Sequence, residues 1–418
     1  MVNSEPHNPP GPARRPRRGP DRRALLRAGL FAGSAGLLAA CGQDGGRAAA
    51  AKPTRVSRPD DPVTLPLAAD NKAIADGLTP EKGATLRLLN YADYLAPDLV
   101  KAFQKEYGCK VQVTTFTTMT EAVEKLRNAS AAPYDVFFPT ADVVGRVVQA
   151  GLLQPVNHSY LGNLANVWPT LQNPFYDQGS RYTVPYNVFS TGIGYRADRI
   201  TSLPANGYDL FWDPAYAGKV YVLDDYREAL ALTLVRRGDF EVNTGDAAVL
   251  GRAGKDLAEL LRTVKVKVGT QQATLLPQGQ ALVHQAWSGD MIAAQYNLAE
   301  DQPATDLGFW YPEQGKGVIG TDCVAVVRGA GSPVLAHHFL DYLLDTDNAG
   351  TNMGWVGYQP AQTAFTPQYM AENEYVPANL TSAIVTEQAY RDCVQLLQLD
   401  VESERLWQDT WAQFNAGS

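Results

Sequence analysis

Acidic and aromatic side chains occur together where predicted strands end. Tyr91, Asp93 and Tyr94 follow one apolar run, and Trp287 and Asp290 follow another. A carboxylate can pair with a cationic group, and the face of an aromatic ring attracts cations and stacks on hydrocarbon. This combination favours the binding of an organic cation over the binding of an anion.

Further polar candidates follow two other predicted strands. Asp225 and Glu228 lie three residues apart at the start of a long apolar helix, where both project from one face of the first turn. Either acid could instead cap that helix or offset its dipole. Thr140 and Asp142 follow the predicted strand 134–138, and capping the next helix is again the alternative to a binding role.

Hydrophobic patterning predicts the elements that position these residues. Strands and helices alternate at 85–90, 98–107, 110–116, 120–128, 134–138 and 141–150. This order implies a parallel sheet covered by helices, and in such sheets ligands bind beyond the carboxyl ends of the strands. Tyr91 and Thr140 fall at such ends.

A second group of strands follows at 190–195, 219–223 and 281–286. The chain then returns through 307–312 and 320–326, and residues 366–418 are predicted to be mostly helical. The pattern therefore favours two lobes.

Residues 1–41 have the features of an export signal. Arg22 and Arg23 precede an apolar stretch at 28–40 that is too short to span a bilayer, and Cys41 follows small residues. This indicates a twin-arginine lipoprotein signal with Cys41 as the lipidated residue; ordinary cleavage beside a chance cysteine is the alternative. Residues 42–83, rich in Gly, Ala and Pro, are predicted to be a flexible tether with little regular structure.

Charge and cysteine content exclude several classes of protein. The chain carries a net charge of −8; the predicted signal contributes +5, which leaves −13 on the remainder. An acidic chain is not expected to bind nucleic acid, but it is compatible with a cationic ligand. Cys109, Cys323 and Cys393 remain after the signal, and their spacing fits no metal motif. We expect neither a cofactor nor a metal.

Seven segments occur in an order that resembles the periplasmic spermidine/putrescine-binding subunits of ABC transporters. They are Asn90-Tyr91-Ala92-Asp93-Tyr94, Tyr134-Asp135-Val136, Pro139-Thr140, Asp209 to Pro214 with Gly218-Lys219-Val220, Leu223 to Glu228, Trp287-Ser288-Gly289-Asp290 and Gly357-Tyr358. The resemblance extends over about residues 84–418. It implies an α/β fold of the two-lobe, type II periplasmic-binding-protein kind, a clamshell in which each lobe is a sheet flanked by helices.

The resemblance also implies a domain organisation and a function. Residues 84–188 with about 308–364 would form lobe 1, 189–307 would form lobe 2, and helices in 365–418 would pack across both. The lobes would close on spermidine or putrescine and deliver it to an ABC permease and ATPase. We expect a monomer outside the cytoplasm, attached to the outer face of the cell membrane only through its lipid anchor.

The pocket that the resemblance implies has aromatic walls, one hydroxyl residue and several acids. Carried over by position, these are Tyr91, Asp93, Tyr94, Thr140, Asp225, Glu228, Trp287, Asp290, Asp322 and Tyr358. Two positions depart from the family: Tyr91 replaces the usual Trp, and Asp142, also a candidate, stands where an aromatic residue is common. Six candidate carboxylates suit the three amines of spermidine slightly better than the two of putrescine.

Other functions stay open at this stage. The same scaffold could hold a sugar, an iron complex or another organic cation, or serve sensing instead of uptake. A secreted hydrolase, which could use paired carboxylates, is a remote alternative. The part of the chain after the signal has no Gly-x-Ser-x-Gly, His-Glu-x-x-His or phosphate-loop motif, so we expect a binding protein and not an enzyme.

Overall fold

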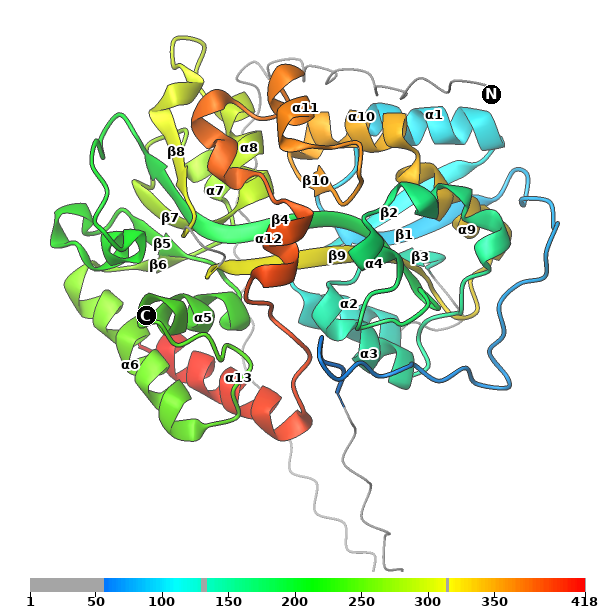
Figure 1. Ribbon diagram of the computed structural model, residues 1–418, viewed down its shortest axis with the longest axis horizontal. Coiled ribbons are helices and arrows are strands. Elements are labelled where there is room, and N and C mark those ends of the chain that lie inside the picture. Colours follow the sequence, from blue (N-terminus) through cyan, green and yellow to red (C-terminus); the bar gives the residue numbers. More distant parts are fainter. Residues whose placement is uncertain (1–55, 129–133, 313–315, 418) are drawn as a thin grey trace, which may run out of the picture.

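The computed structural model describes residues 56–128, 134–312 and 316–417. The predicted signal 1–41, with Cys41, and residues 42–55 of the predicted tether lie outside these ranges. The chain forms two lobes that share one mixed sheet (Figure 1). Within the described ranges, no helix has both the length and the apolar character needed to cross a membrane.

Lobe 1 contains the three predicted strand–helix pairs. These are β1 (Thr85–Tyr91), α1 (Pro97–Tyr107), β2 (Lys110–Phe116), α2 (Met119–Asn128), β3 (Val136–Phe137) and α3 (Ala141–Gln149). Parallel pairing joins β1 to both β2 and β3, as the alternation predicts. The helix α1 ends at Gly108, whose φ of 61° suits a residue without a Cβ, and the Gly108 N–H donates to the Gln104 carbonyl. Two further helices, α9 (Pro333–Leu344) and α10 (Thr346–Val356), complete this lobe.

Two long strands join the lobes. They are β4 (Thr183–Arg196), of which the sequence predicted only the second half, and β9 (Val318–Val326). They pair antiparallel with each other, and Figure 1 shows both passing through the middle of the molecule. In lobe 1, β9 pairs with β3; in lobe 2, β4 pairs with β7 (Val283–Trp287). The sheet is therefore parallel from β2 through β1 to β3, and antiparallel along β9, β4 and β7.

Lobe 2 adds a second parallel unit. Its other elements are β5 (Val220–Val222), α5 (Tyr226–Arg236), α6 (Ala247–Thr263), β6 (Lys267–Val268), α7 (Gln272–Leu275), α8 (Ser288–Ala294) and β8 (Leu307–Trp310). The strand order through both lobes is β2-β1-β3-β9-β4-β7-β5-β6, with β8 and β10 (Gln359–Pro360) paired to β4. Because β8 pairs with Ile193–Arg196, it belongs to lobe 2, and the predicted return to lobe 1 at about 308 is wrong. The chain crosses back within β9.

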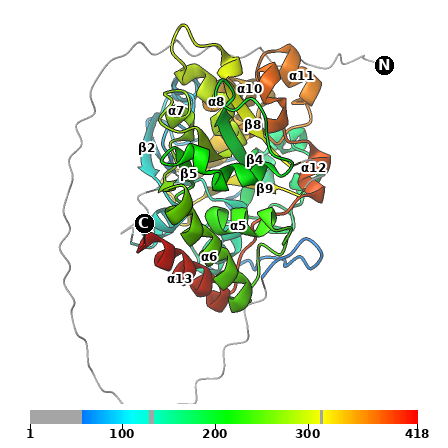
Figure 2. The same ribbon diagram turned by 90° about the vertical axis from the view of Figure 1, so that its left-hand side faces the viewer.

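The C-terminal helices contact different lobes. They are α11 (Pro367–Glu372), α12 (Glu387–Asp392) and α13 (Val401–Asn415). Tyr390 of α12 joins the core of lobe 1, near α4 (Pro169–Gln172), where Thr170 donates to Glu387. Trp407 of α13 is fully buried in the core of lobe 2, and Figures 1 and 2 both show α13 against α5 and α6.

Residues 56–83 form no helix or strand, as predicted, but they are not a free tether. We call this segment the strap, because it lies along lobe 1. Leu65 is buried in the lobe 1 core, Asn71 donates to the Leu153 carbonyl, and the Glu81 carboxylate accepts from two backbone N–H groups at the start of α9. Apolar burial and these hydrogen bonds offset the conformational entropy that a flexible tether would retain. The prediction of flexibility is wrong for this part of residues 42–83.

Candidate functional site

Most of the predicted site residues meet where the two lobes face each other. The carboxyl ends of β1 and β3 in lobe 1, and of β5 and β7 in lobe 2, carry them, as expected for sheets of this kind. Asp322 lies on the crossing strand β9 itself, and Tyr358 lies between α10 and β10. We call this region the cleft.

Tyr94 is at the centre of a group of aromatic rings in the cleft. Its ring centroid lies 5.6 Å from that of Tyr91, 5.4 Å from that of Tyr186 and 5.0 Å from that of Tyr358, all edge to face. Such contacts add roughly 0.5–1.5 kcal/mol each beyond apolar burial. Rings from the first predicted motif and from the late predicted tyrosine are therefore in direct contact.

Asp322 is buried against these rings. Its side chain accepts a hydrogen bond from the Tyr94 hydroxyl and is only 4% exposed. Burial raises the pKa of Asp322 to about 7; the Tyr94 hydrogen bond opposes the shift and the nearby charge of Asp142 adds to it. Burial favours the protonated form of this carboxyl, and a bound cation could take the place of that proton.

Asp290 is linked to the same group through Tyr358. The Tyr358 hydroxyl donates to Asp290 Oδ2 at 3.0 Å, and Gln272 Nε2 donates to the same oxygen. Burial, followed by the charges of Asp290 and Asp322, raises the pKa of Tyr358 well above its usual range. The phenol therefore stays a hydrogen-bond donor at neutral pH.

Glu228 forms the acidic wall on lobe 2. Its Oε1 accepts from Trp287 Nε1 at 3.0 Å and from Thr191 Oγ1 at 2.9 Å. Its Oε2 is buried and meets no hydrogen-bond partner among the described residues. Burial, and then the charge of Asp225, raises the pKa of Glu228 to about 8. A buried carboxyl of this kind favours the neutral form until a cation arrives.

Asp225 is the N-cap of α5, so the capping alternative is correct for this residue. Its Oδ1 accepts from the backbone N–H groups of Arg227 and Glu228 at 2.9 and 3.0 Å. Burial nevertheless raises its pKa, and the charge of Asp142 on the opposite lobe contributes in the same direction. Asp225 therefore both caps the helix and adds negative charge to the cleft.

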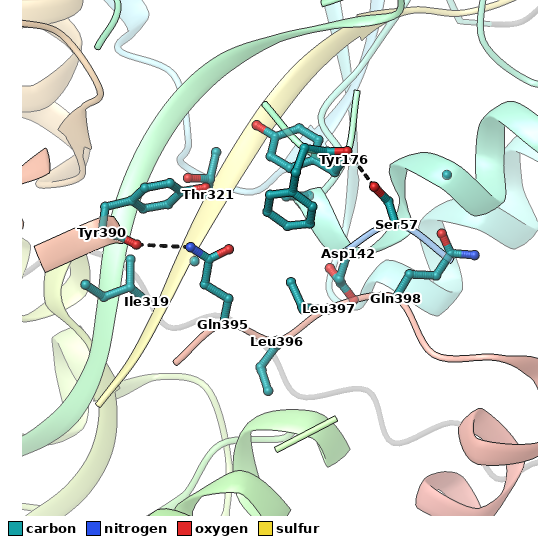
Figure 3. A pocket seen from close by; sticks show the side chains of 14 residues that line it. Ser57, Asp142, Tyr176, Ile319, Thr321, Tyr390, Gln395, Leu396, Leu397 and Gln398 are labelled. Atoms are coloured by element: carbon teal, nitrogen blue, oxygen red, sulfur yellow. Dashed lines mark hydrogen bonds between the residues drawn. The ribbon is translucent and has the colours of Figure 1, made fainter. Parts of the chain in front are cut away.

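Thr140 and Asp142 make no side-chain capping bond to α3, although Thr140 occupies the N-cap position. Thr140 Oγ1 instead donates to Asp142 Oδ1 at 2.5 Å, and Thr140 forms a bridge pair with Asp322. Asp142 also lines a cavity of about 30 Å³, which Figure 3 shows beside the segment Leu396–Gln398. Capping is thus not the role of the Asp142 side chain.

Asp93 differs from Glu228 and Asp322 in its exposure to solvent. It is exposed, with a φ of 55°, and within the described ranges it makes no hydrogen bond or ion pair. Asp tolerates this left-handed conformation better than most residues, so the turn itself accounts for an Asp here. The placement of Asp93 in the pocket wall stays a prediction.

The other aromatic candidates form the walls of the cleft. Tyr91 packs on Phe116 with ring centroids 4.3 Å apart. The ring centroid of Phe189 lies 6.4 Å from that of Trp287 and 6.1 Å from that of Tyr358. The walls thus extend from Tyr91 on lobe 1 to Trp287 on lobe 2.

Several residues that hold the site together were not predicted. The Tyr186 hydroxyl donates to the Tyr94 carbonyl at 2.6 Å, and Asn352 donates to Tyr186 while accepting from the Ala96 N–H. Gln272 donates a hydrogen bond to Asp290, and Thr191 donates one to Glu228. Isolated amides and hydroxyls give no sequence signal, so local patterns could not have found these residues.

The chemistry of the cleft is that of binding. Its polar groups are carboxyls, phenols and an indole N–H, set among rings. In the described part of the chain, no three His, Cys, Asp or Glu residues are arranged to hold a metal ion. All three described cysteines, Cys109, Cys323 and Cys393, are free thiols.

Comparisons with known proteins agree with this geometry. The bacterial extracellular solute-binding protein family matches residues 98–377, more than half of the chain. The putrescine-binding periplasmic protein PotF of Escherichia coli K12 is 28% identical over 347 residues, covering 80% of this chain and 93% of PotF. The spermidine/putrescine-binding periplasmic protein of the same organism is 26% identical over 274 residues, covering 66% and 76%.

A solved structure shares the fold. The spermidine/putrescine ABC transporter substrate-binding protein PotD from Streptococcus pneumoniae has a TM-score of 0.63 and 21% identity, covering 80% of this chain and 99% of that chain. The predicted two-lobe periplasmic-binding-protein fold and the kinship with polyamine-binding proteins are both confirmed. The chain is a solute-binding protein and not an enzyme, and it belongs to the bacterial extracellular solute-binding protein family.

Proposed function

We propose that this chain is an extracytoplasmic receptor that captures a polyamine, spermidine or putrescine, by closure of its lobes and delivers it to an ABC permease and ATPase. The observation that carries the proposal is the pair of buried carboxyls, Glu228 and Asp322, among aromatic rings. Their pKa values, about 8 and about 7, are raised by burial. Protonated amines would pair with these acids, and rings would cover the methylenes between them at roughly 0.8 kcal/mol per buried CH₂.

Two cavities that border predicted site residues are too small for a polyamine. The cavity beside Asp142 has a volume of about 30 Å³, and one beside Glu228 has about 10 Å³. Each is large enough for roughly one water molecule and not for a chain of several carbons. We therefore propose that the ligand enters while the lobes are apart.

A thermal titration tests the ligand. The chain without residues 1–41 is melted in increasing putrescine, spermidine, spermine and neutral sugars. A ligand at 100 times its Kd adds about 2.7 kcal/mol of stability and raises Tm. No shift with any polyamine would sink the proposal, and a shift with a sugar alone would identify a different receptor on the same fold.

We also propose that Cys41 is lipidated and that the chain, a monomer, is attached to the membrane through this lipid. The support is the Arg22-Arg23 pair and the short apolar stretch, followed by Leu38-Ala39-Ala40-Cys41. Cells that produce the protein are labelled with a fatty-acid analogue. Label on the wild type and none on Cys41→Ala is the expected result, and equal label on both would contradict it.

A further inference from the structure

Glu404 connects the two lobes outside the cleft. It lies on α13, which packs on lobe 2, and its Oε1 accepts from Arg146 Nη1 of α3 at 3.1 Å. The same oxygen accepts from the Tyr226 hydroxyl of α5 at 2.5 Å. Since α3 belongs to lobe 1 and α5 to lobe 2, one carboxylate oxygen holds both lobes. Figure 1 shows α3, α5 and α13 on the same side of the crossing strands.

The two helices that Glu404 contacts carry acids of the cleft at their N-terminal ends. Asp142 lies four residues before Arg146, on the same face of α3. Asp225 is the N-cap residue directly before Tyr226. The segment Leu396–Gln398, which leads into α13, borders the same cavity as Asp142 (Figure 3). Glu404 therefore contacts the two helices that carry Asp142 and Asp225, although in the described residues no hydrogen bond or ion pair joins it to either acid.

The Arg146–Glu404 pair is well placed to contribute. The side chains are 35% and 18% exposed, so solvent screens this pair less than a fully exposed one. A charged hydrogen bond in a partly buried site contributes more than an exposed ion pair does. The Arg146 contact requires the lobes to be together, whereas the Tyr226 contact lies within lobe 2 and holds Glu404 in position. Separation of α3 from α13 would therefore break the Arg146 contact alone.

We propose that Arg146, Tyr226 and Glu404 form an interlobe latch, and that Glu404 is a positioning residue that sets the affinity for the cationic solute without touching it. The latch stabilises the closed arrangement, and a ligand that binds this arrangement gains the same free energy. The identity of the ligand rests on the proposed function, whereas the contacts of the latch do not.

Charge-removing variants test the latch by calorimetry with spermidine and putrescine. In Glu404→Gln, an amide oxygen can still accept from Tyr226, but the ion pair with Arg146 is lost. We expect Kd to rise about three- to tenfold in Glu404→Gln and in Arg146→Gln. In the double variant the increase should be clearly smaller than the product of the two single increases, because both remove one interaction.

The matched control is Asp409→Asn on the same helix. Asp409 pairs with Arg405 at 3.9 Å, and both side chains are mostly exposed, at 63% and 80%. This variant should leave Kd unchanged. Thermal melting of the ligand-free variants shows whether a variant has lost stability in general. The latch predicts that Kd rises in Glu404→Gln and Arg146→Gln by more than any loss of Tm explains.

Each outcome decides the proposal. Kd values for Glu404→Gln and Arg146→Gln within twofold of the wild type overturn the latch. If the wild type binds none of the cations, the proposed function fails, and X-ray scattering of the ligand-free chains then judges the latch. In that case a larger radius of gyration for Glu404→Gln than for Asp409→Asn supports the latch, and identical scattering curves overturn it.

Discussion

At the scale of single residues, two buried carboxyls dominate the chemistry of the cleft. Glu228 has one oxygen held by Trp287 and Thr191 and one without a partner among the described residues, while Asp322 accepts from Tyr94. Burial raises the pKa of both, so each retains a proton at a pH where an exposed carboxyl has lost it. Below these pKa values, a cation that binds here competes with the protons.

Polyamine affinity should therefore depend on pH. Amines of this class, with a pKa near that of Lys, about 10.4, remain charged throughout. Below the raised pKa values of about 7 and about 8, the proton competes with the ligand; above them it does not. We expect Kd to fall at least about tenfold between pH 6 and pH 8.5, with net proton release measured by calorimetry in two buffers.

Glu228→Gln should reduce both the affinity and its pH dependence. The control is Glu259→Gln, an exposed acid on α6 of the same lobe, which should behave as the wild type. A Kd that does not change with pH in the wild type would show that protons do not compete with the ligand at these carboxyls.

At the scale of elements, we propose that the first turn of α5 combines a structural and a binding role. Asp225 caps the helix through two backbone N–H groups and also contributes charge to the cleft. Asn caps helices about as well as Asp but carries no charge, whereas Ala does neither. The two substitutions therefore separate the roles.

Asp225→Asn should retain most of the stability and weaken polyamine binding, whereas Asp225→Ala should also lower the free energy of unfolding by about 1 kcal/mol. Asp246→Ala, at the exposed N-cap of α6, is the control and should lower stability alone. Urea unfolding and calorimetry check the two effects. Unchanged affinity in Asp225→Asn would leave capping as the only role.

Gly289, at the start of α8, lies directly against the ring of Tyr358. A Cβ on Gly289 would lie 2.3 Å from the Tyr358 ring, which is too close to be accommodated without moving the ring. Gly289→Ala should therefore displace Tyr358 from Tyr94 and Asp290 and weaken binding. Gly251→Ala on α6 is the control: nothing lies within 4 Å of its Cβ, so it should raise stability by up to about 1 kcal/mol. Equal affinity in both variants would contradict this role of Gly289.

At the scale of the whole molecule, the strap and the C-terminal segment meet at the junction of the lobes. Arg58 Nη1 donates to the Gln398 carbonyl at 2.9 Å, and the Ser57 hydroxyl donates to the Phe175 carbonyl at 2.5 Å. The segment before α13 is held by lobe 2, since Asn243 and Arg227 bond to its backbone. Arg58 therefore forms a second contact between parts that belong to different lobes.

Movement of the lobes should be visible in solution. X-ray scattering with and without a saturating polyamine should give a smaller radius of gyration for the bound chain. Arg58→Ala should raise the radius of the ligand-free chain, while Arg405→Ala on the exposed face of α13 should not. Identical curves with and without ligand would argue that the rings, and not the lobes, move to admit it.

Local sequence patterns determined much of the fold. Apolar runs bounded by Gly and Pro located the strand–helix pairs of lobe 1 within one or two residues, because hydrophobic periodicity and helix termination are local properties. Gly108 follows the predicted helix 98–107 directly, and it is the C-cap of α1. Strand ends carrying acids and rings indicated the cleft, because carboxyl ends of parallel strands meet at one edge of a sheet.

The tertiary structure alone decided the remainder. Pairings such as Thr140 with Asp322, and β8 with β4, join segments far apart in the chain, so no local pattern encodes them. Asp93 and Asp322 are the same residue type in predicted binding motifs, yet one is exposed in a turn and the other is buried against Tyr94. The sequence by itself determined which chemistry is present and the order of the elements. Packing between distant segments decided which carboxyls are buried, and burial is what raises the pKa of Glu228 and Asp322.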